Sequence, residues 1–344
     1  MDLTVERLFA SPDHYLFAFE GDQAVFRTMD RNAYQRSIFL DHRIAAVDDR
    51  ELRVPMEALT SFRDSHGIAA PRTAWIFHVA HCGSTLLARA LDRPEGPLVL
   101  REPRPLRQLG LMRAASAGDA WRARLLVAAA LAGRRYRPEA PTIVKANVPV
   151  NFILTDLLTL DPSAPAILLY FPLRTYFLAI LRSPAHRNWV VNITTQLEPA
   201  TREAAGDLSG LEVAERAAAL WLAQMRHYAE ALARYPGTRS LHADSLFDAP
   251  RPALAAAAAH FGVEMEEAEL DAVVAGGLFA TYSKSPALAF DNAARLSLRA
   301  ENAQLLGPEI ARARRWVESR LDRQPLPVRL DRPLVGESPA LLDT

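Results

Sequence analysis

The sequence predicts an α/β fold, a three-layer sandwich with a central parallel sheet. From residue 72 onward, short apolar segments alternate with segments of helical periodicity, which is typical of β-α-β units. The apolar segments are continuous rather than alternating, as expected of strands that helices cover on both faces. A turn at Gly83, Ser84 and Thr85 joins the first of these strands to the first helix. Such a turn presents backbone amides and a helix N-terminus to an anion, so it is the first candidate site.

Each strand and helix is predicted from its pattern of apolar residues. Short apolar segments predict strands over residues 75–79, 98–100, 142–144, 166–170 and 239–242. Apolar residues at helical spacing predict helices over 84–91, two segments within 106–132, 151–160, 172–181, 213–233, 251–261, 266–274 and 308–321. Residues 198–210 are expected to form a loop.

The chain divides into three predicted regions. Residues 1–70 are expected to form a small β-rich elaboration, because short segments alternate in polarity at 14–19, 24–27 and 34–40 before a helical pattern at 55–62. Within it, the polar triplet Asp41, His42 and Arg43 is interpreted as a solvated turn. Residues 71–325 form the predicted main domain, and the Pro-rich residues 326–344 form an extended tail.

Composition narrows the class of protein. In the 344 residues, Lys and Arg total 40, as do Asp and Glu, so we expect no nucleic-acid partner, which usually requires a basic surplus. Cys82 is the only cysteine, which excludes an intrachain disulfide and a zinc site built from thiolates. A reducing, cytoplasmic location is therefore expected.

No membrane span or signal peptide is expected. The N-terminal residues carry charges at Asp2, Glu6 and Arg7, where a signal peptide needs an apolar core. The most apolar segment, residues 165–181, is interrupted by Pro172 and is short for a span of about 20 residues. A buried strand followed by a buried helix explains this segment better.

The turn at residues 81–85 reads His-Cys-Gly-Ser-Thr and is not a Walker A loop. In that motif, G-x-x-x-x-G-K-[ST], the first glycine would fall on His78 and the lysine on Ser84. The two residue types that diagnose an ATP or GTP phosphate loop are thus replaced. The strand, turn and helix still suit a phosphate or a sulfate.

The order of residues in this turn resembles that of the sulfotransferases, in which a basic residue stands two before a glycine that small hydroxyl residues follow. His81 and Cys82 stand where that family usually has lysine or arginine and serine or threonine. Residues 241–263 also resemble that family, whose strand here leads to an acidic-Leu turn, a proline and a helix ending in Phe-Gly. The resemblance implies a P-loop nucleotide-binding fold. It implies donor-binding residues that are consecutive in this loop: Ala80, His81, Cys82, Gly83, Ser84, Thr85 and Leu86.

Two further residues follow predicted strands. In open parallel sheets, ligands bind beyond the carboxyl ends of the strands. Glu102 follows the strand at 98–100, and Lys145 follows the strand at 142–144. The resemblance implies that Glu102 is the catalytic base, that Lys145 supplies fixed positive charge and that His81 is a further donor. An ion pair of Glu102 with Arg101, Arg104 or Arg107 is the purely structural alternative.

The implied donor is 3′-phosphoadenosine-5′-phosphosulfate (PAPS), whose product is 3′-phosphoadenosine-5′-phosphate (PAP). That family binds the second phosphate with an arginine after the fourth strand and a serine eight residues later. This chain departs there, with Tyr170 or Phe171 and Leu178 or Ala179 at those positions. The nearby basic candidates for binding this phosphate are Arg174 and Arg182. Lys284 is a further candidate, in a flap with Arg295 over the nucleotide.

The function expected from the sequence is transfer of a sulfuryl group from PAPS to a hydroxyl or amine of an acceptor, which is a small molecule, carbohydrate or peptide. No metal is expected to be required. One alternative is a divergent P-loop phosphotransferase using ATP and Mg²⁺, against which the missing lysine counts. The other is a non-catalytic nucleotide- or anion-binding protein of the same fold.

Overall fold

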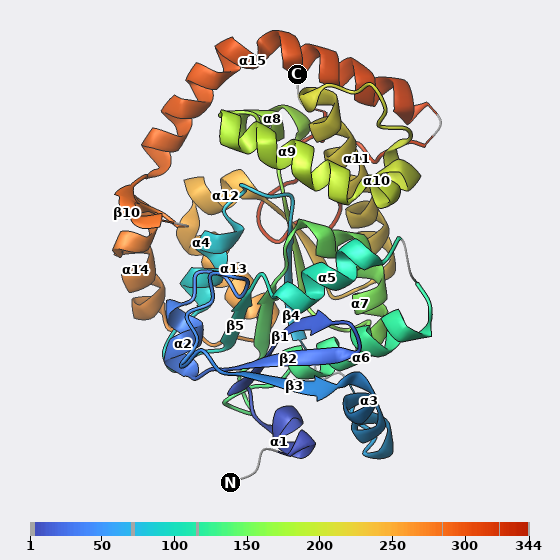
Figure 1. The fold of residues 1–344 in the computed structure, drawn as a ribbon. Coiled ribbons are helices and arrows are strands. Elements are labelled where there is room, and N and C mark those ends of the chain that lie inside the picture. Colours follow the sequence, from blue (N-terminus) through green and yellow to red (C-terminus); the bar gives the residue numbers. More distant parts are fainter. Residues whose placement is uncertain (1–3, 70–72, 115–116, 284, 323, 343–344) are drawn as a thin grey trace. The chain divides into compact units, whose positions relative to one another are not determined.

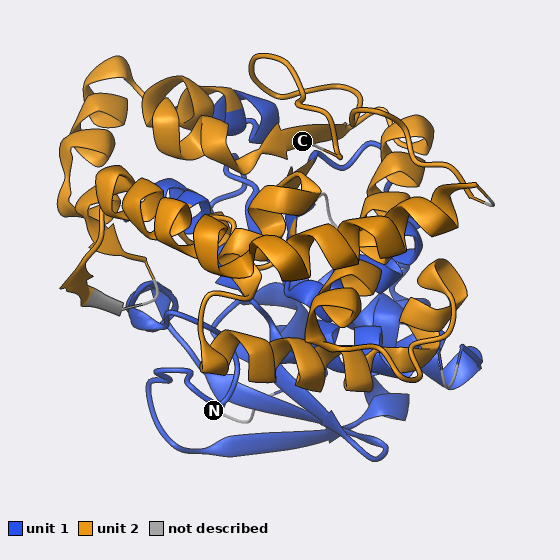
Figure 2. Ribbon diagram, turned by 90° about the horizontal axis from the view of Figure 1, so that it is seen from above, with its two compact units in different colours: residues 1–77, 87–166, 257–265 blue, residues 78–86, 167–256, 266–344 orange. Residues whose placement is uncertain are grey.

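The computed structural model describes residues 4–69, 73–114, 117–283, 285–322 and 324–342 (Figure 1). These residues group into two compact units. Unit 1 contains residues 1–77, 87–166 and 257–265, and unit 2 contains residues 78–86, 167–256 and 266–344 (Figure 2). Each unit is therefore described by itself below.

The predicted parallel sheet is confirmed. It has five strands in the order β5-β6-β4-β7-β8, all parallel. Their bounds are β4 Thr73–His78, β5 Leu98–Arg101, β6 Thr142–Lys145, β7 Ala166–Tyr170 and β8 Thr238–His242. Every residue of β4, β5, β6 and β7 is buried, which is why their sequences are continuous apolar runs. All five strands lie within a residue or two of the predicted positions.

The N-terminal part of unit 1 mixes helices with strands. Its antiparallel sheet has the order β1-β2-β3. The elements are α1 Val5–Ala10, β1 His14–Glu20, β2 Gln23–Thr28, α2 Arg31–Arg36, β3 Glu51–Pro55 and α3 Met56–Ser65. The alternating polarity of residues 34–40 predicted extended structure, and this prediction was wrong. Asp30 caps α2 by accepting a hydrogen bond from the Ala33 amide (2.5 Å), so residues 31–36 are helical.

The remaining helices of unit 1 follow the predicted pattern. Their bounds are α5 Arg104–Met112, α6 Asp119–Ala132, the 3₁₀ helix η1 Val148–Ile153 and α7 Leu154–Leu160. Helix α4, Ser84–Leu91, begins at the predicted residue and passes from unit 2 into unit 1.

Unit 2 is mainly helical. Its elements are α8 Leu173–Ile180, α9 Pro184–Gln196, α10 Glu198–Ala205, α11 Val213–Arg234, α12 Ala243–Asp248, the first part of α13 Pro250–Phe261, α14 Glu267–Ala275, η2 Gly277–Ala280, β9 Thr281–Tyr282, β10 Ser285–Ala289 and α15 Asn292–Leu321. From residue 257 onward, α13 belongs to unit 1. Of the elements in unit 2, α9, α12, η2, β9 and β10 were not predicted. The apolar segment 165–181 forms β7 and α8, as expected from the sequence.

Two predictions in unit 2 were wrong. Residues 198–205 form α10 instead of a loop, because Glu198 pairs with Arg202 one turn later and Gly206, at φ +88°, ends the helix. Helix α15 begins at Asn292 rather than at residue 308. Asp291 caps it by accepting from the Ala294 amide (2.8 Å), and Pro308 lies inside a helix that Figure 1 shows to be bent.

The C-terminal residues run extended beside β8. The Ser240 amide donates to the Arg332 carbonyl (3.0 Å), and the Leu334 amide donates to the Ser240 carbonyl (2.7 Å). Leu330 and Leu341 are almost fully buried, so this segment belongs to the packed part of unit 2.

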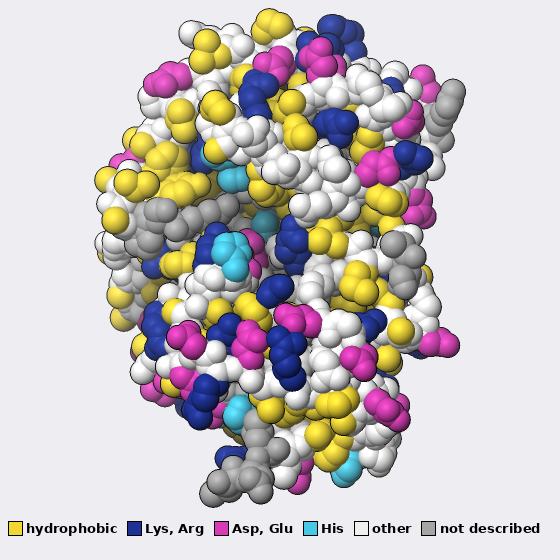
Figure 3. Space-filling model, in the orientation of Figure 1, with side chains coloured by type: hydrophobic (Ala, Val, Ile, Leu, Met, Phe, Trp, Pro, Cys, Tyr) yellow, Lys and Arg dark blue, Asp and Glu magenta, His cyan; other side chains and the backbone are white. Residues whose placement is uncertain are grey.

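Basic and acidic side chains are interspersed on the face shown in Figure 3, in keeping with the equal numbers of both in the sequence. Within the described part of the chain, we find no helix with both the length and the apolar character needed to cross a membrane.

Candidate functional site

The loop after β4 has an unusual backbone. Ala80, His81 and Gly83 have φ values of +72°, +50° and +83°. Residues other than glycine rarely adopt positive φ, and such strain is concentrated at binding and catalytic sites. Successive residues of this kind turn backbone N–H groups toward one concave side, which suits an anion.

The hydroxyl side of this loop contains a polar atom without a partner. Ser84 and Thr85, at the start of α4, are 4% and 2% exposed. Among the described residues, the Thr85 Oγ1 atom has no hydrogen-bond partner. A buried hydroxyl normally forms a hydrogen bond, so Thr85 is suited to donate one to a bound anion. Cys82 is fully buried, and its thiol donates to the Leu169 carbonyl (3.8 Å).

Gly83 is fixed by its backbone and by an aromatic neighbour. A Cβ atom at this position would lie 2.7 Å from Cζ of Phe247, a residue of α12. Since both the positive φ and the ring oppose a side chain, Gly83 lets Phe247 approach the loop directly.

Gly83→Ala is expected to destabilise the protein by more than the roughly 1–2 kcal/mol that a left-handed L-residue costs, because the Phe247 ring must also move. Gly206→Ala is the matched control: Gly206 has φ +88°, but no atom lies within 4 Å of the place that a Cβ atom would occupy there. Denaturant titration of both variants measures the difference. Equal losses of stability would show that the ring contact contributes nothing.

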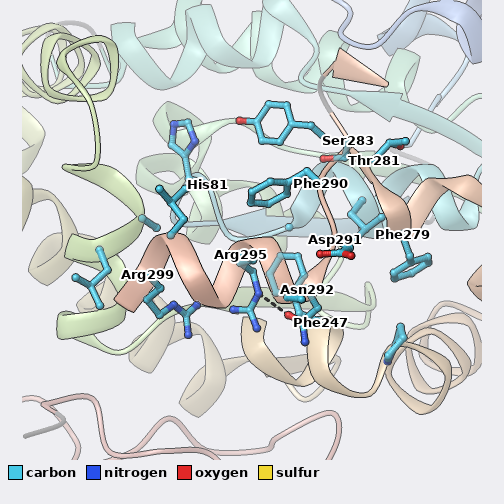
Figure 4. A pocket seen from close by; sticks show the side chains of 18 of the residues that line it. His81, Phe247, Phe279, Thr281, Ser283, Phe290, Asp291, Asn292, Arg295 and Arg299 are labelled. Carbon is cyan, nitrogen blue, oxygen red and sulfur yellow. Dashed lines mark hydrogen bonds between the residues drawn. The ribbon is translucent and has the colours of Figure 1, made fainter. Parts of the chain in front are cut away.

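A pocket of about 380 Å³ lies in unit 2, with His81, Gly83 and Leu86 in its wall. The rest of the lining includes five aromatic residues: Phe171, Phe247, Phe279, Tyr282 and Phe290. The basic residues in the lining are Arg182, Arg295 and Arg299. Figure 4 shows Arg295 and Arg299 projecting from α15. This volume and lining fit a ligand with a planar ring and negative charge.

Asp244 holds the two arginines of α15 in place. Arg299 donates to both carboxylate oxygens (2.9 and 2.9 Å), and Nη1 of Arg295 donates to Oδ1 (2.5 Å). Burial alone would raise the pKa of Asp244, but the hydrogen bond and charge of Arg299, with Arg295 and His242, lower it below the ordinary value. Asp244 therefore stays ionised and orients both guanidinium groups.

Stacking and hydrogen bonds fix each arginine further. The Arg295 guanidinium lies 4.4 Å from the centroid of Phe247 and donates to Asn292 Oδ1 (2.7 Å), as Figure 4 shows. The Arg299 guanidinium lies 5.4 Å from the centroid of Phe171. Burial lowers the pKa of Arg295, which Asp244 opposes. Nη2 of Arg295 also donates to Oδ1 of Asp248 (3.0 Å), so two carboxylates hold the two guanidinium groups in fixed orientations at the pocket.

His81 lies in a group of rings in unit 2. Its ring centroid is 4.4 Å from that of His186 and 5.8 Å from that of Trp189. Nε of Arg182 donates to Nε2 of His186 (3.1 Å), and Nη2 donates to the Tyr282 hydroxyl (3.3 Å). Arg182 thus connects α9 to β9 at the pocket.

In unit 1, the structure brings Glu102 and Lys145 together. They form an ion pair between Nζ of Lys145 and Oε1 of Glu102, with side-chain exposures of 0% and 18%. Glu102 has φ +57°, and its amide donates to the Lys145 carbonyl (2.7 Å). Lys145 is thus an ion-pair partner of Glu102, and Arg101, one of the arginines of the structural alternative, pairs with Asp92.

Two backbone hydrogen bonds join Leu40 to residues before and after Glu102. The Leu40 amide donates to the Arg101 carbonyl (2.8 Å), and the Arg104 amide donates to the Leu40 carbonyl (3.2 Å). The neighbouring Phe39 ring lies 5.5 Å from Nζ of Lys145. The N-terminal segment thus forms part of the surroundings of the candidate base, where the sequence indicated only a solvated turn.

The other predicted donor-binding residues have different positions. Arg174 is exposed on α8 and is not among the lining residues of the pocket, whereas Arg182 is. Lys284 lies outside the described residues. The sequence marked Asp244 only through the acidic-Leu turn, and it did not mark Phe247 or Arg299, because neither the start of α12 nor that of α15 was predicted.

No protein-family model matches this chain, and no curated protein matches it significantly. Within the residues described, no group of three or more His, Cys, Asp or Glu side chains is arranged to hold a metal ion.

Proposed function

We propose that this chain is a sulfotransferase-like enzyme that transfers a sulfuryl group from PAPS to a hydroxyl or amine of an acceptor. The observation that supports it best is the pocket of unit 2, in which the strained loop, aromatic rings and oriented arginines line one volume. An adenine nucleotide combines a planar ring with several negative charges, so it complements all three features.

The residues present fit a nucleotide donor. The loop amides suit the phosphosulfate end, and so does the hydroxyl of Thr85, which has no hydrogen-bond partner among the described residues and lies in the same loop but outside the lining of the pocket. Arg182, Arg295 and Arg299 are the cations of the pocket, and in this proposal they replace the arginine and serine that the chain lacks for the second phosphate. The same proposal takes the fold to be of the P-loop nucleotide-binding type.

In the proposed reaction, Glu102 accepts the proton of the acceptor hydroxyl or amine. The acceptor oxygen or nitrogen forms a bond to sulfur, and the bond from sulfur to the bridging oxygen breaks. That oxygen leaves with the electron pair on PAP, where the loop amides and His81 stabilise its charge. Lys145 has no exposed side-chain surface, so we assign it the task of holding the carboxylate of Glu102.

Thermal unfolding with PAP, and in parallel with ATP plus Mg²⁺, tests the donor assignment. PAP at about 100 times its dissociation constant should stabilise the protein by about 2.7 kcal/mol, and ATP with Mg²⁺ should stabilise it far less. Stabilisation by ATP alone would favour a phosphotransferase. No stabilisation by either ligand would contradict a nucleotide site.

A further inference from the structure

The arginines in the lining of the unit 2 pocket have partners of two kinds. Arg295 and Arg299 are held by carboxylates, because both donate to Asp244 and Arg295 also donates to Asp248. These carboxylates compensate much of the positive charge of the two guanidinium groups before any ligand binds. The remaining arginine of the described lining, Arg182, is held in another way.

Both hydrogen-bond acceptors of Arg182 are uncharged. Its Nε atom donates to Nε2 of His186 (3.1 Å), and its Nη2 atom donates to the hydroxyl of Tyr282 (3.3 Å), which also lines the pocket. In the described part of the chain, the Arg182 side chain forms no further hydrogen bond and no ion pair with a carboxylate. Arg182 is therefore fixed in position while it keeps its positive charge.

The two neighbours of the His186 ring determine where its proton lies. A guanidinium can only donate, so Nε2 of His186 accepts and carries no proton. The proton of the neutral ring is then on Nδ1, which lies 2.6 Å from Oγ of Ser183. The same Ser183 oxygen accepts from the His186 amide (3.4 Å) at the start of α9. His186 is thus held as a neutral acceptor that faces Arg182.

The positive end of the pocket lies near the loop after β4. The His186 ring that holds Arg182 has its centroid 4.4 Å from that of His81, which is in the wall of the pocket. Asp291 is the carboxylate of the described lining, and it caps α15 by accepting from the Ala294 amide. Figure 4 shows Asp291 on the other side of the pocket from His81. An anionic group of a ligand is therefore favoured at Arg182.

We infer that Arg182 binds a phosphate group of the nucleotide, and that His186 is the positioning residue that orients Arg182 for this task. The inference rests on the proposed function, because the nucleotide is the ligand. Nη1 of Arg182 forms no hydrogen bond within the described residues, so its two N–H groups are available to phosphate oxygens. A neutral acceptor suits this role, since it orients the guanidinium without reducing its charge.

Glutamine and glutamate at position 186 test the inference, because they have the same size and both accept a hydrogen bond from Arg182. Isothermal titration calorimetry on the full chain compares PAP with adenosine, which has no phosphate. His186→Gln should bind PAP within about threefold of the wild type. His186→Glu compensates the charge of Arg182 and should bind PAP about tenfold or more weakly, with no loss for adenosine. A merely structural role would give the opposite order, since a carboxylate is the stronger partner of arginine.

Two further variants separate the contributions. Asn192→Glu adds a negative charge at an exposed position of the same helix and should leave the affinity for PAP unchanged. His186→Phe keeps a ring beside His81 but offers no acceptor, so it should weaken binding of PAP. Combined with Arg182→Gln, it should cause no loss beyond that of Arg182→Gln alone, because His186 acts through Arg182.

The inference is overturned if His186→Glu binds PAP as tightly as His186→Gln, or if His186→Phe weakens binding further in the Arg182→Gln background. If His186→Glu does not fold, Arg182→Gln decides: an affinity for PAP equal to that of the wild type then overturns the inference. Failure of the proposed function gives a different result, namely no binding of PAP to the wild-type chain.

Discussion

Replacing Glu102 with glutamine should lower turnover of PAPS with any accepted acceptor by about 10²–10⁴-fold, the usual contribution of a general base. Glutamine preserves the size of the side chain but cannot take up a proton at neutral pH. Since Glu102 is not among the residues that line the pocket, binding of PAP there should change little. Release of PAP measured at saturating PAPS gives the first quantity, and calorimetry gives the second.

Glu95→Gln is the control for this variant, since Glu95 forms an exposed ion pair with Arg137 and should leave turnover unchanged. An unchanged rate in Glu102→Gln would remove the assignment of the base. If the wild-type chain binds PAP but shows no turnover with any acceptor, the chain is a non-catalytic binding protein.

The same assay distinguishes between two roles of Lys145, holding Glu102 and acting on the donor. If Lys145 acts by holding Glu102, the double variant Glu102→Gln with Lys145→Met should be no slower than Glu102→Gln alone. If the two losses multiply, Lys145 acts on the donor by itself, as the family resemblance implies.

The sheet could be predicted from the sequence for a simple reason. Strands covered on both faces need continuous apolar side chains, and 75–79 or 166–170 have no other good interpretation. Helix α10 was missed because its segment lacks large apolar side chains at helical spacing, and the residues that it buries are Thr201 and Ala205. The start of α15 was missed because proline is favoured at helix starts, so Pro308 indicated a beginning where the chain has an interior.

Some residues of the candidate sites could be selected from the sequence, and others could not. The loop at 80–86, Glu102 and Lys145 could be selected because each lies at the carboxyl end of a strand, where ligands bind in open parallel sheets: Glu102 directly follows β5, and Lys145 is the last residue of β6. Arg299 could not, since its importance depends on Asp244, a partner distant in sequence. Arginines on helix surfaces are common, and only the structure distinguishes the oriented ones from the solvated ones.

Replacing Arg101 with methionine should destabilise the protein by up to about 3–5 kcal/mol, the cost of breaking a buried ion pair, because Asp92 then retains only the partly exposed Arg31, whose Nη2 lies 3.1 Å from its Oδ1. Arg101 and Asp92 have side-chain exposures of 2% and 3%, and Nη1 of Arg101 donates to Asp92. The same guanidinium donates to the carbonyls of Tyr34 (2.7 Å), Gln35 (3.0 Å) and Ser37 (2.6 Å). Methionine fills a similar volume but satisfies none of these acceptors.

This loss should also reach the surroundings of Glu102. The Arg101 side chain donates to the segment that ends in Leu40, and Leu40 forms backbone hydrogen bonds to the residues around Glu102. We therefore expect Arg101→Met to lower turnover even where the protein remains folded. Urea titration measures stability, and the release of PAP without urea, at a temperature well below unfolding, measures activity. Arg137→Met, which breaks exposed ion pairs with Glu95 and Glu139, should have a far smaller effect on both. If Arg101→Met is as stable as Arg137→Met, the carbonyls of residues 34–37 accept hydrogen bonds from other donors. The segment is then held in place without Arg101.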